Sequence, residues 1–284
     1  GKSWITSAFA CWNWLMDPQK NILVISASKT RADDFSTFTQ RLINELPVLA
    51  HLQPRDDQRS SKVSFDVGPA RASHAPSCKS MGITGQLTGS RADLIIADDV
   101  ESANNSQTQL MRDRLSETVK EFDSIIKPEI GRIVFLGTPQ TELSIYNSLE
   151  ERGYKTQIWP ARFPDSKAII SYGRKLAKQI LEQNEKYKPG QPLDPKRFDE
   201  VDLMEREASY GRSGFSLQFM LDTTLSDTNK YPLKLNDLII MSGCSTWEEA
   251  PGKVQWANSI DQIKALDSEL PNVGLKGDYF VAPM

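Results

Sequence analysis

The stretch Leu94-Ile-Ile-Ala-Asp98-Asp99 decides the fold, because an unbroken apolar run here ends in two carboxylates. A short run of this kind is typical of a strand that is buried on both faces of a parallel sheet. Residues 21–27 and 133–136 form two more such runs. Between and around the three runs, helical periodicity predicts helices at residues 3–16, 30–45, 107–126 and 144–152. This alternation predicts an α/β fold with a mostly parallel sheet flanked by helices.

The pattern of the sequence changes after residue 161. Up to that point a further short strand is expected at residues 63–67, within a stretch rich in Gly, Pro and Arg. Beyond it, residues 171–187 and 199–220 are expected to be helical. The remainder is rich in turn residues and has only short apolar pieces. We therefore expect three parts, a core at residues 1–161, a small helical subdomain at 162–221 and a linker at 222–284.

The composition narrows the possible functions. A net charge of -3 over 284 residues gives no global basic field, which argues against a passive DNA-coating role. The chain has 3 Cys and 2 His, too few for a disulfide framework, a zinc cluster or Ser-His-Asp chemistry. No apolar run approaches the roughly 20 residues that a transmembrane helix needs, so no membrane partner is expected.

Gly1-Lys2-Ser3 stands directly before the first predicted helix. It has the form of the end of the phosphate-binding motif G-x-x-x-x-G-K-[ST]. In that motif the lysine contacts the β- and γ-phosphates, the hydroxyl holds Mg²⁺, and the helix start faces the anion. The tripeptide alone is common by chance. We expect the chain to begin in mid-domain and to bind ATP poorly by itself, because the other backbone amides of the motif would lie upstream.

Asp98, Asp99 and Glu101 follow the central apolar run. A buried strand that ends in acids is what a Walker B element needs, one acid to hold Mg²⁺ and a neighbour to orient water. Asp98, at the end of the strand, is predicted to hold the metal. Asp99 or Glu101 is predicted to orient water, with a slight preference for Glu101 because of its reach. A strand whose edge residues are acidic without any such role is the alternative.

Gly137, Thr138 and Gln140 follow the third apolar run. Because the carboxyl ends of parallel strands meet at the ligand-binding edge of the sheet, these residues are expected close to the acids. An ordinary Gly-Thr-Pro turn is the alternative for this segment.

Arg91 precedes the central strand and is the candidate for an arginine finger that serves a neighbouring subunit by neutralising transition-state charge. An ion pair or an exposed loop arginine is the alternative.

Taken together, these elements resemble the phage terminase large subunit family, and within it the DNA maturase B proteins of short-tailed phages. Order and spacing match, with the Gly-Lys-Ser start roughly ninety residues before the acids. The resemblance covers essentially the whole chain, and the matching segments are residues 24–29, 64–69, 82–101, 136–141, 158–161, 215–220 and 270–277.

The resemblance implies an ASCE-type P-loop NTPase that hydrolyses ATP with Mg²⁺. In this family the ATPase moves double-stranded DNA into a procapsid, and a C-terminal RNase H-like nuclease cuts the concatemer; the nuclease acids are not in this chain. It also implies a homo-oligomeric ring on the portal, a small terminase subunit as partner, and the host cytoplasm as location. The residue roles carried over are ATP binding for Gly1, Lys2 and Ser3, Mg²⁺ binding for Ser3 and Asp98, and coupling for Gly137, Thr138 and Gln140.

Two other functions fit the same residues. A helicase-type translocase would use the same ATP chemistry but would separate strands. A degenerate P-loop protein would serve only as a docking module, and nucleotide binding by the full-length protein would distinguish it.

Overall fold

A computed structural model describes residues 2–87, 89–141, 143–184 and 186–223. Three predictions fall wholly or largely outside these residues. They concern Gly1 as an ATP ligand, the linker, of which only residues 222 and 223 are described, and the matching segment at residues 270–277.

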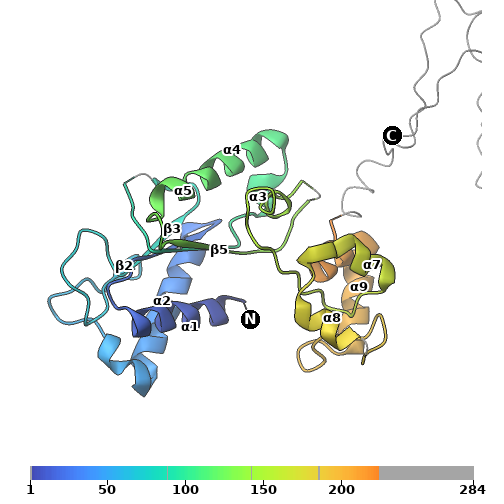
Figure 1. Ribbon diagram of the computed structural model, residues 1–284, viewed down its shortest axis with the longest axis horizontal. Helices are drawn as coiled ribbons and strands as arrows, with labels where there is room; N and C mark the ends of the chain where they lie inside the picture. Colours follow the sequence, from blue (N-terminus) through green and yellow to red (C-terminus); the bar gives the residue numbers. More distant parts are fainter. Residues whose placement is uncertain (1, 88, 142, 185, 224–284) are drawn as a thin grey trace, which may run out of the picture. The chain divides into compact units, whose positions relative to one another are not determined.

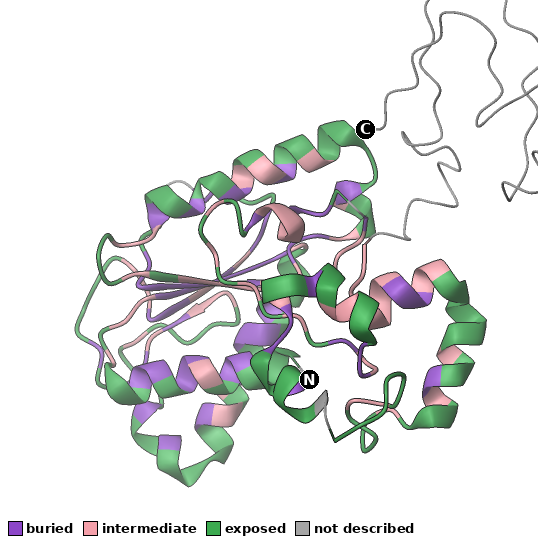
Figure 2. Ribbon diagram, turned by 45° about the vertical axis from the view of Figure 1, so that its right-hand side comes forward, coloured by how far each residue is buried: buried purple, intermediate pink, exposed green. Residues whose placement is uncertain are grey.

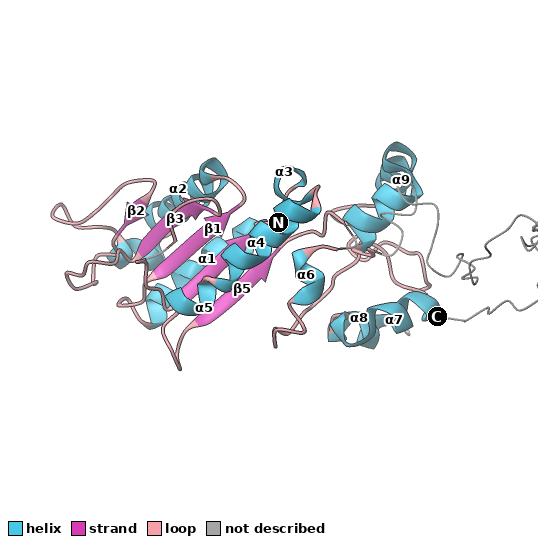
Figure 3. Cartoon of the chain, turned by 90° about the horizontal axis from the view of Figure 1, so that it is seen from above, coloured by secondary structure: helices cyan, strands magenta, loops and turns pink. Residues whose placement is uncertain are grey.

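The core of the fold is a five-stranded sheet in the order β2-β3-β1-β4-β5. Every strand pairs in parallel with its neighbour except β2, which is antiparallel to β3. Figure 3 shows the strands from above, with helices along them. The predicted α/β class is therefore confirmed. The strands are β1 (Ile22–Ser26), β2 (Ser64–Phe65), β3 (Cys78–Gly82), β4 (Leu94–Asp98) and β5 (Arg132–Leu136).

Helices cover both faces of the sheet (Figure 1). Alternate side chains of β1 and β4 point to opposite faces, because the side-chain period of a strand is two. Ile22 and Val24 pack in the cluster with α1 and α2, whereas Leu23 and Ile25 pack in the cluster with α4 and α5. All five residues of β1 are buried, which explains the unbroken apolar run. Figure 2 shows buried residues, in purple, along the strands and on the helices that pack against them. The covering helices are α1 (Lys2–Met16), α2 (Lys29–Glu45), the 3-10 helix η1 (Pro47–Leu52), α4 (Gln109–Lys120), α5 (Phe122–Ile125) and α6 (Ile145–Ser148).

The strand β3 was not predicted, although it pairs directly with the central strand β1. Its sequence, Cys-Lys-Ser-Met-Gly, contains too little apolar surface to be recognised as a buried strand. The structure tolerates this composition because the polar groups are paired. The Ser80 hydroxyl donates to Asp33 Oδ1 at 2.7 Å, and Lys79 Nζ donates to Ser90 Oγ at 3.0 Å. Hydrogen bonds therefore satisfy the polar side chains of this strand, while Cys78 and Met81 pack against the two apolar clusters.

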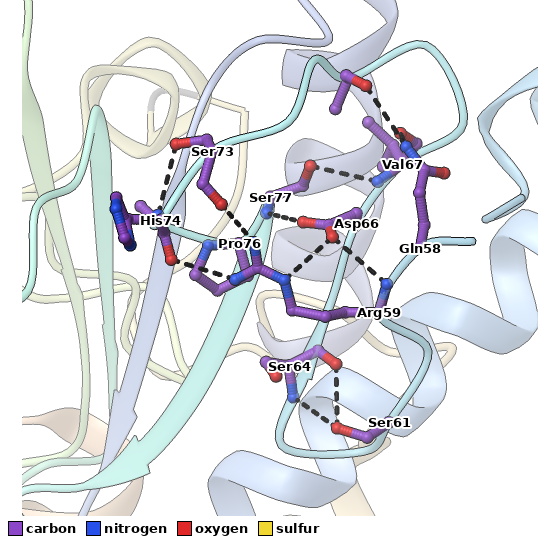
Figure 4. Close-up of polar contacts among 12 residues, drawn as sticks. Gln58, Arg59, Ser61, Ser64, Asp66, Val67, Ser73, His74, Pro76 and Ser77 are labelled. Atoms are coloured by element: carbon purple, nitrogen blue, oxygen red, sulfur yellow. Dashed lines mark hydrogen bonds and ion pairs between the residues drawn. The ribbon is translucent and has the colours of Figure 1, made fainter.

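Polar contacts fix the irregular chain around β2 (Figure 4). The ion pair between Arg59 Nε and Asp66 Oδ2 is 3.1 Å long, and the same guanidinium donates to the carbonyl oxygens of Ser73 and His74. Asp66 Oδ1 accepts from the Ser77 amide at 3.1 Å. One arginine and one aspartate thus hold segments up to 18 residues apart in sequence, from Arg59 to Ser77. The predicted strand at residues 63–67 is correct in place but only two residues long.

Three of the predicted helices are broken in the structure. The helix predicted at residues 199–220 is interrupted at Gly211, which has a φ of 68°, and it ends in a π-helical turn. Residues 107–126 form α4 and α5, and the helix predicted at residues 171–187 is wrong as a single element. Gly173 has a φ of 55°, a left-handed conformation that glycine adopts readily, and it ends α7. The predicted helix at 144–152 covers only α6. The remaining elements are α3 (Ala103–Ser106), α7 (Ser166–Tyr172), η2 (Gly173–Lys175), α8 (Lys178–Asn184), α9 (Glu200–Phe215) and the π-helical turn η3 (Ser216–Met220).

The helical region beyond residue 161 has a small apolar core of its own, formed by Phe163, Tyr172, Leu176, Ala177 and Ile180. A separate core is what an independent subdomain needs. The boundaries at residues 161 and 221 stay predictions. None of the helices in the described ranges has the length and apolarity required to cross a bilayer.

Candidate nucleotide site

Lys2, Ser3, Asp98, Asp99 and Thr138 of the predicted site meet at the carboxyl edge of the sheet. Ser26 of β1 is in register with Asp98 of β4, and Asp98 is in register with Leu136 of β5, so the three strands end together. The amino end of α1 lies at the same edge, because Lys2 and Ser3 contact the acids there. Ser3 and Asp98, which are 95 residues apart in the sequence, therefore meet at this edge.

Ser3 and Asp98 form one contact pair of the site. Ser3 Oγ donates to Asp98 Oδ2 at 2.9 Å. Asp98 Oδ1 is buried and has no hydrogen-bond partner among the described residues. An unpaired buried carboxylate oxygen carries a desolvation cost that a cation would relieve. One carboxylate and one hydroxyl are hard oxygen donors and suit Mg²⁺, which keeps most of its ligands as water and phosphate oxygens. The donor set thus fits this metal.

Burial raises the pKa of Asp98 above the ordinary aspartate value, the Ser3 hydrogen bond opposes the shift, and the charge of Asp99 adds to it. A raised pKa in the folded state means that the carboxylate destabilises the fold once it ionises. The destabilisation is absent below the unfolded-state pKa and appears as the pH rises through the folded-state pKa.

We expect Asp98→Asn to raise the unfolding temperature of the chain at neutral pH without metal or nucleotide, because Asn carries no charge at any pH. The advantage should vanish at a pH below about 3.9, the ordinary pKa of aspartate. Thermal unfolding followed by circular dichroism at both pH values measures this. Equal unfolding temperatures at neutral pH would contradict it.

Lys2, Asp99 and Thr138 form the more exposed part of the site. Lys2 Nζ lies 2.9 Å from Asp99 Oδ1 and 3.4 Å from Thr138 Oγ1. The side chains of Lys2 and Asp99 are 41% and 36% exposed. An ion pair this exposed contributes little to stability. An incoming phosphate can therefore take the place of Asp99 at the ammonium group at small cost.

Asp99 has an unusual backbone conformation, with a φ of 47°. Its amide donates to the Leu136 carbonyl at 2.7 Å, and its carbonyl accepts from the Ala27 amide at 3.2 Å. Both neighbouring strands therefore hold this residue in the left-handed region, which aspartate tolerates better than most residues. Outliers held in this way often occur at functional sites.

Gly137 begins the segment that follows β5. A Cβ atom at this position would overlap the ring of Tyr146, so only glycine fits. The Gln140 side chain folds back on the same segment, and its Nε2 donates to the Thr138 carbonyl at 3.1 Å. The predicted cluster of Gly137, Thr138 and Gln140 thus does lie at the acidic edge, through the contact of Thr138 with Lys2.

Glu101 has a different environment from the one its sequence position suggested. Its side chain is buried, with the residue 3% exposed, and both carboxylate oxygens accept hydrogen bonds from residues 140–145. The preference for Glu101 over Asp99 as the residue that faces a γ-phosphate is therefore not supported. Asp99, the ion-pair partner of Lys2, is the better placed of the two.

Arg91 lies at the opposite edge of the sheet from the site, just before β4 begins. Its Nη1 donates to the Ser124 carbonyl at 3.0 Å. Since Asp98 is at the other end of β4, Arg91 does not belong to the site of its own chain. A role toward a neighbouring subunit stays a prediction.

Ser144 and Tyr146 were not predicted, yet both contact Glu101. The only signal in the sequence is their closeness to the Gly-Thr-Pro-Gln segment. Serine and tyrosine at the start of a short helix have too many ordinary roles for that signal to identify them.

The fold and this site define an α/β protein of the P-loop NTPase class, with Lys2 and Ser3 at the start of α1 facing the acids at the end of β4. The chain is 52% identical, over 98% of its length, to the terminase large subunit of Enterobacteria phage T3. It is thus related by sequence to the terminase large subunits, and it spans about half, 48%, of the length of that relative.

Two further comparisons add little. The structure is similar to the large terminase ATPase domain of Thermus phage P74-26, with a TM-score of 0.41 and 13% sequence identity over 79% of this chain and 84% of that chain. No protein-family model matches the chain.

Proposed function

We propose that this chain is the ATP-hydrolysing part of a terminase large subunit, which uses Mg-ATP to drive double-stranded DNA into a procapsid. The observation that carries the proposal is the meeting of Lys2, Ser3, Asp98, Asp99 and Thr138 at one sheet edge. The 52% identity to a protein named as a terminase large subunit supports the assignment to packaging.

Each side chain has a role that follows from its contacts. Lys2 exchanges its exposed pair with Asp99 for the β- and γ-phosphates. Ser3 and Asp98 would hold Mg²⁺, which neutralises charge on the phosphates when it is bound. Asp99, released from Lys2, accepts a hydrogen bond from the attacking water and orients it toward the γ-phosphate. Glu101 has no direct part in these steps of ATP binding and hydrolysis.

Thr138 and Gln140 report the state of the nucleotide in this proposal. Thr138 lies 3.4 Å from the ammonium group that exchanges partners, and Gln140 is hydrogen-bonded to the carbonyl of Thr138. When the ammonium group of Lys2 exchanges Asp99 for phosphate, the Thr138 side chain therefore transmits this change to the segment after β5. That segment would pass the change on to the surface that moves DNA.

The assembly of the motor is part of the same proposal. The subunits form a ring on the portal of the procapsid in the host cytoplasm, with a small terminase subunit as a further partner. Arg91, which is remote from its own site, is proposed to complete the site of the next subunit by neutralising transition-state charge. We further propose that the full-length subunit also cuts concatemeric DNA as an endonuclease.

We expect Gln140→Ala in the full-length polypeptide to abolish DNA packaging while leaving ATP affinity within about two- to threefold of wild type. The substitution removes the side-chain contact with Thr138 but keeps the Gln140 backbone amide, which donates to Glu101 at 2.9 Å. Nuclease protection of DNA in procapsids measures packaging, and calorimetry measures affinity.

The matched control is Gln157→Ala, because the exposed Gln157 also donates its amide to a nearby carbonyl, that of Thr156. Equal loss of binding and packaging in Gln140→Ala would show that the segment is only structural. Strand separation on a forked duplex would instead indicate a helicase-type translocase. Absence of nucleotide binding in the wild type would indicate a docking module.

A further inference from the structure

The carboxylate of Glu101 is enclosed by the segment that follows β5. Oε1 accepts from the Gln140 amide at 2.9 Å, and Oε2 accepts from Ser144 Oγ at 2.9 Å and from the Ile145 amide at 2.8 Å. The donors span six residues, from Gln140 to Ile145. A single buried side chain thus holds both ends of this stretch.

These contacts are strong ones. Hydrogen bonds to an ionised acceptor are shorter and stronger than those between neutral groups, and a buried charge is tolerated only where such donors compensate it. No ion pair of Glu101 occurs in the described part of the chain, so backbone amides and a hydroxyl provide the compensation. Removing the charge would leave buried donors without an acceptor.

The backbone of Glu101 is tied to the same segment. Its amide donates to Tyr146 Oη at 3.4 Å, and the Tyr146 ring lies against Gly137, where a Cβ would overlap it. Burial raises the pKa of Tyr146, so its hydroxyl stays protonated at neutral pH. Glu101, which stands two residues after Asp99 in the sequence, therefore contacts the segment at four residues, Gln140, Ser144, Ile145 and Tyr146.

We propose that Glu101 is a positioning residue that locks the described residues of the segment after β5, 137–141 and 143–146, to the end of β4, so that Asp99 and Gln140 move as one body. The role in hydrolysis rests on the proposed function, whereas the lock itself does not. A residue that orients water must present an acceptor that water can reach, whereas Glu101 is only 3% exposed and both of its carboxylate oxygens accept from protein donors.

The lock is tested first without ATP, by hydrogen–deuterium exchange on the 284-residue chain. Glu101→Gln should speed exchange at the amides of Gln140 and Ile145 by about 10- to 100-fold, the effect of losing one charge-assisted hydrogen bond. Ser144→Ala, which removes one of three donors, should give a smaller increase. Amides in the middle of α2 should not change in either variant.

The controls address folding. Ser144 also caps α6, because its hydroxyl accepts from the Tyr146 amide. Ser148→Ala removes a different hydrogen bond of α6, to the Ile145 carbonyl, and so measures how much a weakened helix alone speeds exchange. If Glu101→Gln fails to fold, Ser144→Ala still tests the lock. Unchanged exchange at Gln140 and Ile145 in every folded variant would overturn the inference.

ATP turnover by the full-length polypeptide separates positioning from water orientation. Positioning predicts that Glu101→Gln and Ser144→Ala each lower turnover and that the double variant is no worse than Glu101→Gln, because both act through one contact. A loss of turnover in Glu101→Gln alone, with normal exchange, would identify Glu101 as the water-orienting residue and overturn the inference. If the wild type hydrolyses no ATP, the proposed function fails, and the exchange result still decides on the lock.

Discussion

Asp98→Asn in the full-length polypeptide is expected to remove Mg²⁺-dependent ATP affinity and ATP turnover together. Asp98 Oδ1 is buried and has no hydrogen-bond partner in the described structure, and Oδ2 accepts from the Ser3 hydroxyl at 2.9 Å. An amide keeps the shape of the side chain but supplies neither the negative charge nor the second acceptor that the metal needs. The loss should exceed about 10- to 100-fold, the range measured for residues one shell further from a metal.

Titrating ATP affinity against Mg²⁺ concentration measures this loss. The wild type should gain affinity as Mg²⁺ is added, and Asp98→Asn should not. Asp113→Asn is the matched control, since Asp113 is an exposed residue of α4. Normal Mg²⁺ dependence in Asp98→Asn would show that the metal is held elsewhere.

Asp99→Asn is expected to lower turnover by about 100- to 10,000-fold while leaving Mg-ATP affinity nearly unchanged. Asparagine tolerates the left-handed backbone of this position as well as aspartate does, so the substitution changes charge without disturbing the turn. A residue that acts mainly in the transition state changes turnover more than binding.

Single-turnover kinetics and equilibrium binding, measured on the same preparation, separate the two quantities for Asp99→Asn. Loss of affinity equal to the loss of turnover would mean that Asp99 acts through its ion pair with Lys2. A loss of turnover below tenfold would exclude Asp99 as the water-orienting residue.

The parts of the fold that could be predicted are those where burial dictates sequence. The strands β1 and β4 are buried on both faces, so their residues are almost all apolar and the pattern is unambiguous. The strand β3 is equally central but satisfies its polar side chains through Asp33 and Ser90, and no local pattern reveals partners that are distant in sequence. The break at Gly173 was missed because a single glycine is compatible with a helix until its φ is known.

The candidate site, like the fold, has parts that the sequence predicts and parts that depend on contacts between distant residues. Strand ends at the carboxyl edge could be predicted to converge, and Lys2, Ser3, Asp98 and Thr138 do converge. The roles of Asp99 and Glu101 could not be separated, since both are acids just beyond one strand. What separates them is the backbone turn at Asp99, which leaves one carboxylate exposed beside Lys2 and the other buried against Gln140.

The most direct test of the central claim is ATP hydrolysis by the Lys2→Ala variant of the full-length polypeptide in the presence of Mg²⁺. Because Lys2 is proposed to bind the phosphates of ATP, the wild type should hydrolyse ATP and Lys2→Ala should show no turnover above background. The control is Lys167→Ala, at another exposed lysine, which should retain wild-type activity. Turnover by Lys2→Ala equal to that of the wild type would place the nucleotide site elsewhere and contradict the account.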